Sequence, residues 1–260
     1  MSLNIGPALK SGIDQLISRT GAVLLLAYVA LYAVYQSAFN GLLLVAYQRM
    51  GLPTEEAALP MPLDAPLPVL GAIVLATLLV MTYWSVVAVR TFVAEQRQRI
   101  PREFLTHRPV FAVGNLLVGG IVLTILLAVG FVLLVVPGVY MMVAFLFMTV
   151  FIAVEDDNFV TALKRSWSLT DGNRLDLFLL LLVVMALGFV VGFGFSLAQM
   201  AVVFVGASEA LLLAANVVLI APMSLFNLAV VAAAYNQLRE DEAGDGPAAG
   251  TSAPDAPSPV

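Results

Sequence analysis

Long runs without a charged residue dominate the hydropathy pattern of this chain. A helix needs about 20 predominantly apolar residues to cross the hydrocarbon core of a bilayer. Five runs reach that length: 21–47, 67–89, 109–154, 177–208 and 210–238. The third is 46 residues long and would measure about 69 Å as one helix, roughly twice the hydrocarbon thickness. It is therefore expected to cross twice, with a break at Pro137-Gly138, where proline interrupts the backbone hydrogen bonds.

The pattern predicts an all-α, polytopic transmembrane bundle of six helices, because backbone groups in lipid must be satisfied internally and no run alternates as a barrel strand does. We expect one transmembrane domain over residues 1–238, followed by a disordered acidic cytoplasmic tail over 239–260 that is rich in Ala, Pro, Gly, Ser and Asp. The expected spans are about 21–47, 67–89, 109–136, 138–154, 177–205 and 210–236.

Basic residues that flank membrane spans are retained in the cytoplasm, so their positions predict the orientation. With six spans and both termini in the cytoplasm, Arg49 is the one basic residue on the outer side. The other eleven lie inside: Lys10, Arg19, Arg90, Arg97, Arg99, Arg102, Arg108, Lys164, Arg165, Arg174 and Arg239. This asymmetry predicts a multi-pass protein of the plasma membrane with cytoplasmic N- and C-termini.

Composition narrows the function classes. The chain is 61% hydrophobic and 11% charged, with no cysteine and one histidine, His107. Disulfides, thiolate metal sites and sites with several histidine ligands are therefore excluded, and we expect no metal, no cofactor and no enzymatic activity. The net charge is −5, whereas nucleic-acid-binding surfaces are positively charged, so no nucleic-acid partner is expected. The low lysine content and the acidic tail are features expected of a protein from a halophile.

Short amphipathic or basic segments precede each pair of spans, at residues 3–19, 94–108 and 158–175. The order of one segment and two helices, three times over, is consistent with an internal repeat and equally with shared membrane composition. The basic stretch from Arg90 to Arg108, which includes the second segment, is interpreted as an orientation signal on a solvated face, with a partner-docking site as the alternative. His107 is expected to be a surface residue.

The third segment has the clearest pattern. Asp157 or Asn158 is expected to cap a helix whose end Gly172 closes in a left-handed conformation. Phe159, Leu163 and Trp167 recur on one face, which is typical of a helix lying at the membrane interface. Two interpretations follow: a connector on the membrane surface, or a binding site for anionic lipid headgroups. The site would consist of Lys164, Arg165, Trp167 and Arg174.

Polar residues inside the spans form two stripes, and no ionisable residue is expected at mid-depth, which weakens the case for ion-coupled transport. One stripe lies on the first helix and the other on the sixth, where Pro222 should produce a kink. They could line an intramembrane cavity or bridge helices for stability alone. The stripes are Tyr28, Tyr32, Gln36 and Asn40, and Asn216 and Asn227.

A family resemblance follows from Pro137-Gly138-Val139-Tyr140, the span end at Val154-Glu155, and the run Ala162-Leu163-Lys164-Arg165-Ser166-Trp167-Ser168-Leu169-Thr170-Asp171-Gly172. This part of the chain, roughly 130–200, resembles the six-helix membrane domain that is sometimes fused to glycerophosphodiester phosphodiesterases, and its stand-alone bacterial and haloarchaeal relatives. The resemblance implies a membrane module. It implies no phosphodiesterase activity, because six spans consume the chain and one histidine cannot supply that catalytic domain's acid/base pair and metal site.

These observations favour a non-enzymatic membrane module that interacts with membrane lipids, through anionic headgroups on the cytoplasmic face, or with a membrane or cytoplasmic protein partner. The alternative is a transporter or permease subunit for a small solute or lipid, indicated by the polar stripes and by Pro222.

Overall fold

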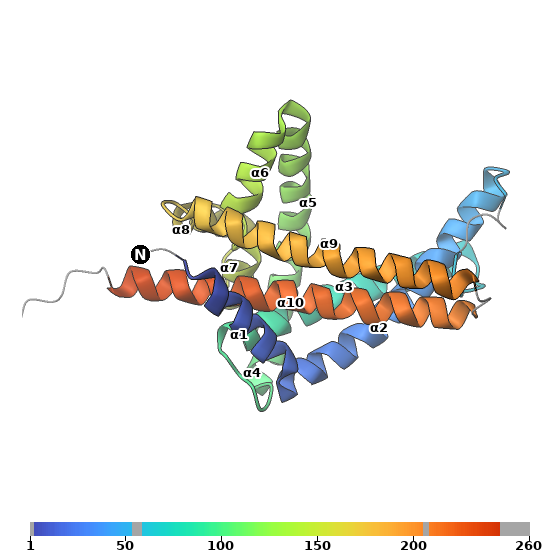
Figure 1. Cartoon of the computed structure of the whole chain (residues 1–260), viewed down its shortest axis with the longest axis horizontal. Helices are drawn as coiled ribbons and strands as arrows, with labels where there is room; N and C mark the ends of the chain where they lie inside the picture. Colours follow the sequence, from blue (N-terminus) through green and yellow to red (C-terminus); the bar gives the residue numbers. More distant parts are fainter. Residues whose placement is uncertain (1–2, 54–58, 205–207, 245–260) are drawn as a thin grey trace, which may run out of the picture.

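The computed structural model describes residues 3–53, 59–204 and 208–244, which form helices joined by turns and short connections (Figure 1). No strand occurs in these ranges, so the all-α prediction is confirmed. In chain order the helices are α1 (Ile5–Ile17), α2 (Arg19–Arg49), α3 (Leu67–Val93), α4 (Arg102–Thr106), α5 (Pro109–Leu133), α6 (Val135–Ala144), α7 (Met148–Val154), α8 (Phe159–Leu169), α9 (Arg174–Phe204) and α10 (Glu209–Gly244).

Six helical segments of the described chain are long and apolar enough to cross a membrane, with α6 and α7 together forming the fourth. The protein is therefore a multi-pass membrane protein by length and composition. Short helices precede each pair, α1 before α2, α4 before α5 and α8 before α9. These are the three positions predicted from the sequence, although α4 is a single short turn of helix.

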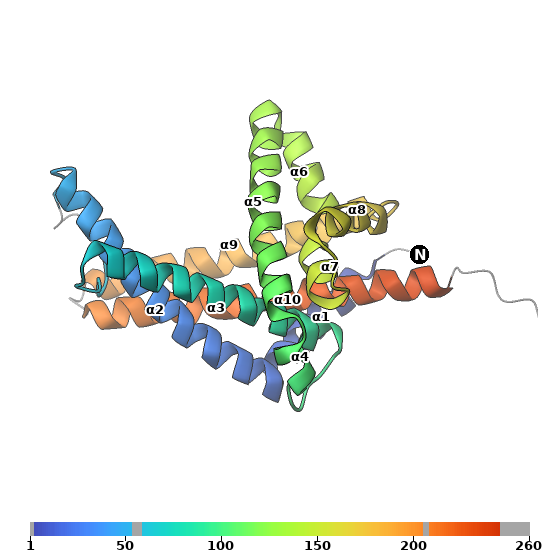
Figure 2. The same cartoon turned by 180° about the vertical axis from the view of Figure 1, so that it is seen from behind.

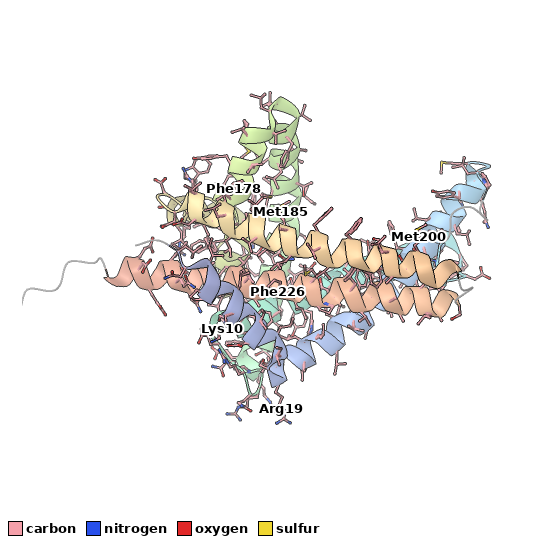
Figure 3. All side chains as sticks on the ribbon, viewed as in Figure 1. Lys10, Arg19, Phe178, Met185, Met200 and Phe226 are labelled. Carbon is pink, nitrogen blue, oxygen red and sulfur yellow. The ribbon has the colours of Figure 1, made fainter. Side chains whose placement is uncertain are left out.

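Three long helices, α3, α9 and α10, run along the long axis of the molecule, and α2 crosses obliquely to them (Figures 1 and 2). Helix α10 packs against α1, α2, α3 and α9. The faces of α10 that meet these neighbours contain small residues, including Ala229, Ala232 and Ala233, all buried. On α1, Gly12 lies directly against Val230 and near Phe226 of α10 (Figure 3). Small side chains thus let the amphipathic α1 lie close to the central helix, as is common in membrane bundles.

The α5–α6 hairpin projects sideways from this long axis, near the end where α1, α4 and α8 lie (Figures 1 and 2). Its two helices meet through glycine, because a Cβ atom on Gly130 would lie 3.0 Å from Cα of Gly138. We call this hairpin, residues 109–144, the arm.

The turn of the arm lies earlier than predicted. Helix α5 ends at Leu133 and α6 starts at Val135, with Leu134 extended between them. Pro137 and Gly138, where the break was predicted, lie inside the first turns of α6. Proline is tolerated there because the first N–H groups of a helix have no intrahelical partner.

A second break separates α6 from α7, and α8 holds it in place. The hydroxyl of Ser166 donates to the carbonyl oxygen of Ala144 at 2.9 Å and accepts a hydrogen bond from the N–H of Phe147 at 3.1 Å. Helix α8 begins as predicted, since Asn158 accepts from the N–H of Thr161 at 3.0 Å. Gly172 has φ of +81°, the left-handed conformation expected after the helix.

The predicted boundary between the domain and its tail is not a break in structure. Helix α10 continues past residue 238 to Gly244, so the first residues of the predicted tail are helical. The rest of that tail, residues 245–260, lies outside the described residues.

Candidate functional site

Arg174, the first residue of α9, lies between two aromatic rings. Its guanidinium carbon is 4.7 Å from the ring centroid of Tyr140 in α6 and 4.8 Å from that of Trp167 in α8. The rings of Tyr140 and Trp167 are themselves in edge-to-face contact, with centroids 5.3 Å apart. Three elements therefore converge on one cation, and such stacking is favourable for a planar guanidinium.

The hydrogen-bond donors of Arg174 are only partly used. One Nη donates to the Tyr140 hydroxyl and pairs with a carboxylate oxygen of Asp171 at 3.2 Å, and the other donates to the carbonyl oxygen of Trp167 at 3.3 Å. Its Nε is buried and has no hydrogen-bond partner in the structure. Asp171 is 73% exposed, so the pair is weak and a stronger anion can displace it.

An apolar groove of about 460 Å³ opens beside this cation, between α6 and α9. Arg174 and Tyr140 are among the residues that line it, and Phe178 lies one helical turn further along α9 (Figure 3). The remaining lining is Val135, Val136, Val139, Val143 and Leu175. A charged base and an aliphatic wall give the groove the chemistry of an amphiphile-binding site.

Lys164 belongs to a second, adjacent groove of about 370 Å³, which it lines with Phe145, Val160, Leu163 and Trp167. The Trp167 ring connects the two grooves, since it contacts Tyr140, which lines the first, and Phe145, which lines the second, with the Phe145 and Trp167 ring centroids 5.7 Å apart. Lys164 is exposed and makes no ion pair or hydrogen bond with any described residue. We refer to Lys164, Trp167, Arg174 and Tyr140 as the interfacial cluster.

The structure thus brings together Lys164, Trp167 and Arg174 of the predicted headgroup site, but directs Arg165 elsewhere. The Arg165 guanidinium pairs with Glu155 and, at 2.7 Å, with Asp157. It also stacks on the Phe151 ring at 4.5 Å. Arg165 therefore holds the acidic loop that links α7 to α8, residues 155–158.

Glu155 is the centre of that loop. It accepts a hydrogen bond from the Tyr235 hydroxyl of α10, and it pairs with Arg165 and, at 3.2 Å, with Arg239. Burial alone raises the pKa of Glu155, but the hydrogen bonds from Tyr235 and Arg165 outweigh burial, so its pKa is lower than the ordinary value. For Arg165, burial lowers the pKa and the bonds to Asp157 and Glu155 outweigh it, so its pKa is raised.

Arg90 of α3 corrects one prediction. It was assigned to a solvated basic face, yet it is 6% exposed. Its Nε donates to the carbonyl oxygen of Ala153 at 2.5 Å, and one Nη donates to the carbonyl oxygens of Phe104 and His107 at 3.2 and 2.8 Å. A planar guanidinium can satisfy several carbonyl groups at once, and Arg90 thereby joins α3, α4 and α7.

His107 and Asp156 complete this cluster. The ring Nε2 of His107 lies 2.5 Å from a carboxylate oxygen of Asp156, and the other carboxylate oxygen is 3.6 Å from Arg90. The His107 side chain is half-exposed, as its predicted surface position requires. Asp156 holds a left-handed backbone conformation, φ +54°, so the turn is shaped around these contacts.

The polar stripes are distributed among several structural contacts. Gln36 donates to Asn40 at 2.9 Å, and Asn40 donates to the carbonyl oxygen of Pro60 at 2.7 Å, which fixes the connection after α2. Tyr28 packs against the buried apolar cluster that includes Leu225 of α10. Tyr32 contacts Tyr35, with ring centroids 6.1 Å apart. Apart from the packing of Tyr28 against α10, these contacts lie within α2 or in the connection that follows it.

The two asparagines of α10 do not meet that stripe in any described contact. Asn227 is exposed and donates to the carbonyl oxygen of Met223 in its own helix at 2.9 Å. Asn216 is half-buried. The intramembrane cavity stays a prediction.

Several residues of the site were missed by sequence reasoning. The acidic residues 155–157 directly follow a span, and Arg90 and Arg239 lie at the basic ends of two other spans. This pattern could have indicated ion pairs between the acidic residues and Arg90 or Arg239. No sequence signal indicated Tyr140 or Ser166 individually, because their partners come from other helices.

A family model described as a domain of unknown function, DUF7847, matches residues 3–238, so the chain belongs to that family. No curated protein and no solved structure matches the chain. Nothing in these comparisons connects the chain with the membrane domain of glycerophosphodiester phosphodiesterases, and that resemblance stays a prediction.

Proposed function

We propose that this DUF7847 protein is a membrane module that binds an anionic lipid of the cytoplasmic leaflet at the interfacial cluster. The lipid phosphate would pair with Arg174 and Lys164, and one acyl chain would lie in the groove between α6 and α9. Binding is the whole of the proposed activity, with no chemical step. The end of the molecule that carries the cluster faces the cytoplasm of a plasma membrane in this proposal, because eleven of twelve basic residues flank the inner ends of the spans.

The observation that carries the proposal is the position of Arg174. A cation whose buried Nε has no hydrogen-bond partner is part of the lining of an apolar groove. Guanidinium groups bind phosphate through two parallel charge-assisted hydrogen bonds. The Tyr140 and Trp167 rings restrict the plane of the guanidinium, so less side-chain entropy is lost when an anion binds.

The groove suits a hydrocarbon chain for a similar reason. Its walls are valine side chains from α6 and Leu175 and Phe178 from α9, and each methylene that leaves water for such a wall contributes about 0.8 kcal/mol. Trp167, 40% exposed, is the residue type that gathers where hydrocarbon meets headgroups. A headgroup and a chain can thus be held at the same time.

The proposal is tested by measuring which lipids remain bound after purification. The protein is reconstituted in nanodiscs of mixed phosphatidylcholine and phosphatidylglycerol, extracted in mild detergent, and its bound lipids are counted by mass spectrometry. We expect enrichment of phosphatidylglycerol. Arg174→Gln removes one charge-assisted contact and should reduce the enrichment about tenfold, as loss of about 1.4 kcal/mol implies.

The matched control is Arg97→Gln, which removes an exposed cation from the connection between α3 and α4, away from the groove. It should leave the enrichment unchanged. Equal retention of both lipids by the unmodified protein, or equal losses in the two variants, would contradict the proposal. Excess inorganic phosphate distinguishes the sources of the anion: it should not displace a lipid whose chain also lies in the groove.

A further inference from the structure

The turn of the arm is unusual for a connection that would emerge at the outer face of a membrane. From residue 125 to residue 139 there is no polar side chain. Val132, Leu133 and Val136 at the turn are 87%, 70% and 77% exposed. The other two turns at the far end of the spans do have charged residues in or beside them, with Arg49 at the end of α2, Asp64 before α3 and Glu209 at the start of α10.

The orientation of the arm relative to the long helices is consistent with the absence of polar side chains at its turn. The arm leaves the body close to α4 and α8, at the end of the molecule that carries Lys10 and Arg19 (Figure 3), and it runs across the long axis shared by α9 and α10 rather than along it (Figures 1 and 2). If those two helices cross the bilayer, the arm lies along the plane of the membrane, on its cytoplasmic side.

The turn of the arm places very little backbone outside the two helices. Leu134 is the one residue between the two helices, and its N–H bonds to the carbonyl oxygen of Gly130 at 3.1 Å. Pro137 has no N–H to satisfy. A one-residue turn between glycine-packed helices leaves only the unpaired groups that helix ends have, which limits the irregular backbone that a leaflet must accommodate.

We propose that the arm does not cross the membrane but lies in the cytoplasmic leaflet, with its exposed faces covered by the acyl chains of that leaflet. Four helices, α2, α3, α9 and α10, then cross. An arm that enters and leaves on one side keeps both termini in the cytoplasm, so the distribution of basic residues is explained equally well. This inference is independent of the lipid site, because it concerns the whole arm and not the interfacial cluster.

A depth scan tests it in the reconstituted full chain. Single cysteines replace Val110, Ile121 and Val132, which are exposed and share one face of α5, and each carries a fluorophore. Lipids with a quencher at different positions along the acyl chain report the depth of each label. The natural absence of cysteine makes every label specific.

An arm in the plane of the leaflet should give three depths that agree within about 5 Å. A crossing helix would instead move by about 16 Å between neighbouring positions, since eleven residues rise that far, with Ile121 deepest. Such a profile overturns the proposal. The matched control uses Leu175, Leu182 and Phe189 along one face of α9, where depth should increase toward the bilayer centre from the first position to the third.

Labelling in intact cells adds a second readout. A membrane-impermeant maleimide should label Ser208→Cys from outside, should label Gln98→Cys only after the cells are opened, and should not label Val135→Cys in either case. Labelling of Val135→Cys from outside overturns the proposal. If lipid quenchers reach none of the three α5 positions, another protein surface covers the arm, such as a second copy of the chain, and the proposal is equally wrong.

Discussion

Ser166 of α8 connects to Ala144, the last residue of α6, through a hydrogen bond of 2.9 Å from its hydroxyl to the Ala144 carbonyl oxygen. The same hydroxyl accepts the N–H of Phe147 just before α7. Both groups are orphaned by the break between α6 and α7, and orphaned backbone groups away from water are costly. One buried side chain therefore makes an interrupted helix acceptable at this position.

Ser166→Ala should lower the free energy of unfolding by about 1–3 kcal/mol, because the N–H of Phe147 loses its partner and the Ala144 carbonyl oxygen keeps only the longer contact with the Thr170 hydroxyl, at 3.5 Å. The measurement is equilibrium unfolding in mixed micelles of a mild detergent and a denaturing one. Ser168→Ala, at an exposed position of the same helix, is the control and should change the value by less than about 0.5 kcal/mol. Equal effects in the two variants would exclude this role for Ser166.

Arg90→Gln should be more damaging, with a loss of about 3 kcal/mol, because Asp156 and the carbonyl oxygens of Ala153, Phe104 and His107 lose a buried cationic donor. Arg90→Lys should recover only part of the loss, since an ammonium group cannot reach three carbonyl groups in one plane. Unfolding experiments of the same kind provide the measurement, and full recovery by lysine would contradict the planar-donor explanation.

Acid should weaken the attachment of the acidic loop. The pKa of Glu155 in the folded protein is lowered from 4.5, so the folded state binds fewer protons than the unfolded state in this range. The stabilisation is then fully present above pH 4.5 and is lost as the pH falls through the folded-state pKa. Unfolding midpoints between about pH 3 and pH 7 should therefore fall at the acid end.

Glu155→Gln is the variant for comparison, and its pH profile should be flatter at the acid end than that of the unmodified chain. Tyr235→Phe removes one hydrogen bond to Glu155 and should move the acid transition toward higher pH. A Glu155→Gln profile that overlays the original one would assign the acid sensitivity to other carboxylates.

Trp167 offers a spectroscopic measure of the interface. The chain has two tryptophans, so Trp84→Phe leaves Trp167 as the one emitter. Because Trp167 lies on the exposed side of α8 beside Lys164, lipids brominated near the headgroup should quench it more strongly than lipids brominated near the chain ends. The reverse order would place α8 too deep for an interfacial headgroup site. The Trp167→Phe variant reports the contribution of Trp84.

Local signals in the sequence predicted a large part of the fold. Charge-free runs of about 20 residues indicate membrane-spanning segments because of bilayer thickness alone, and Asn158 and Gly172 mark the limits of α8 because capping depends on neighbours in the chain. The position of the α5–α6 turn was wrong by a few residues, since proline fits the first turn of a helix as well as a break.

The candidate site was predicted only in part, and Arg165 shows why. Arg165 is a cation next to Lys164 in the sequence, so both were assigned to the headgroup site. In the structure Arg165 instead pairs with Glu155 and Asp157 of the acidic loop. These pairs form only when α7 and α8 pack against each other. Tyr140 and Trp167 were part of one sequence pattern, yet their contact with Arg174 required α6, α8 and α9 to meet.

The sequence by itself determined that this protein resides in a membrane, that it is helical, and which of its ends carries the positive charge, because these properties follow from the length and composition of single segments. Tertiary structure alone decided that Arg90 is buried, that Ser166 supports a broken helix, that Arg174 lines an apolar groove, and that the arm leaves the bundle sideways. Each of these depends on contacts between helices far apart in the chain, where packing rather than local pattern selects the partner.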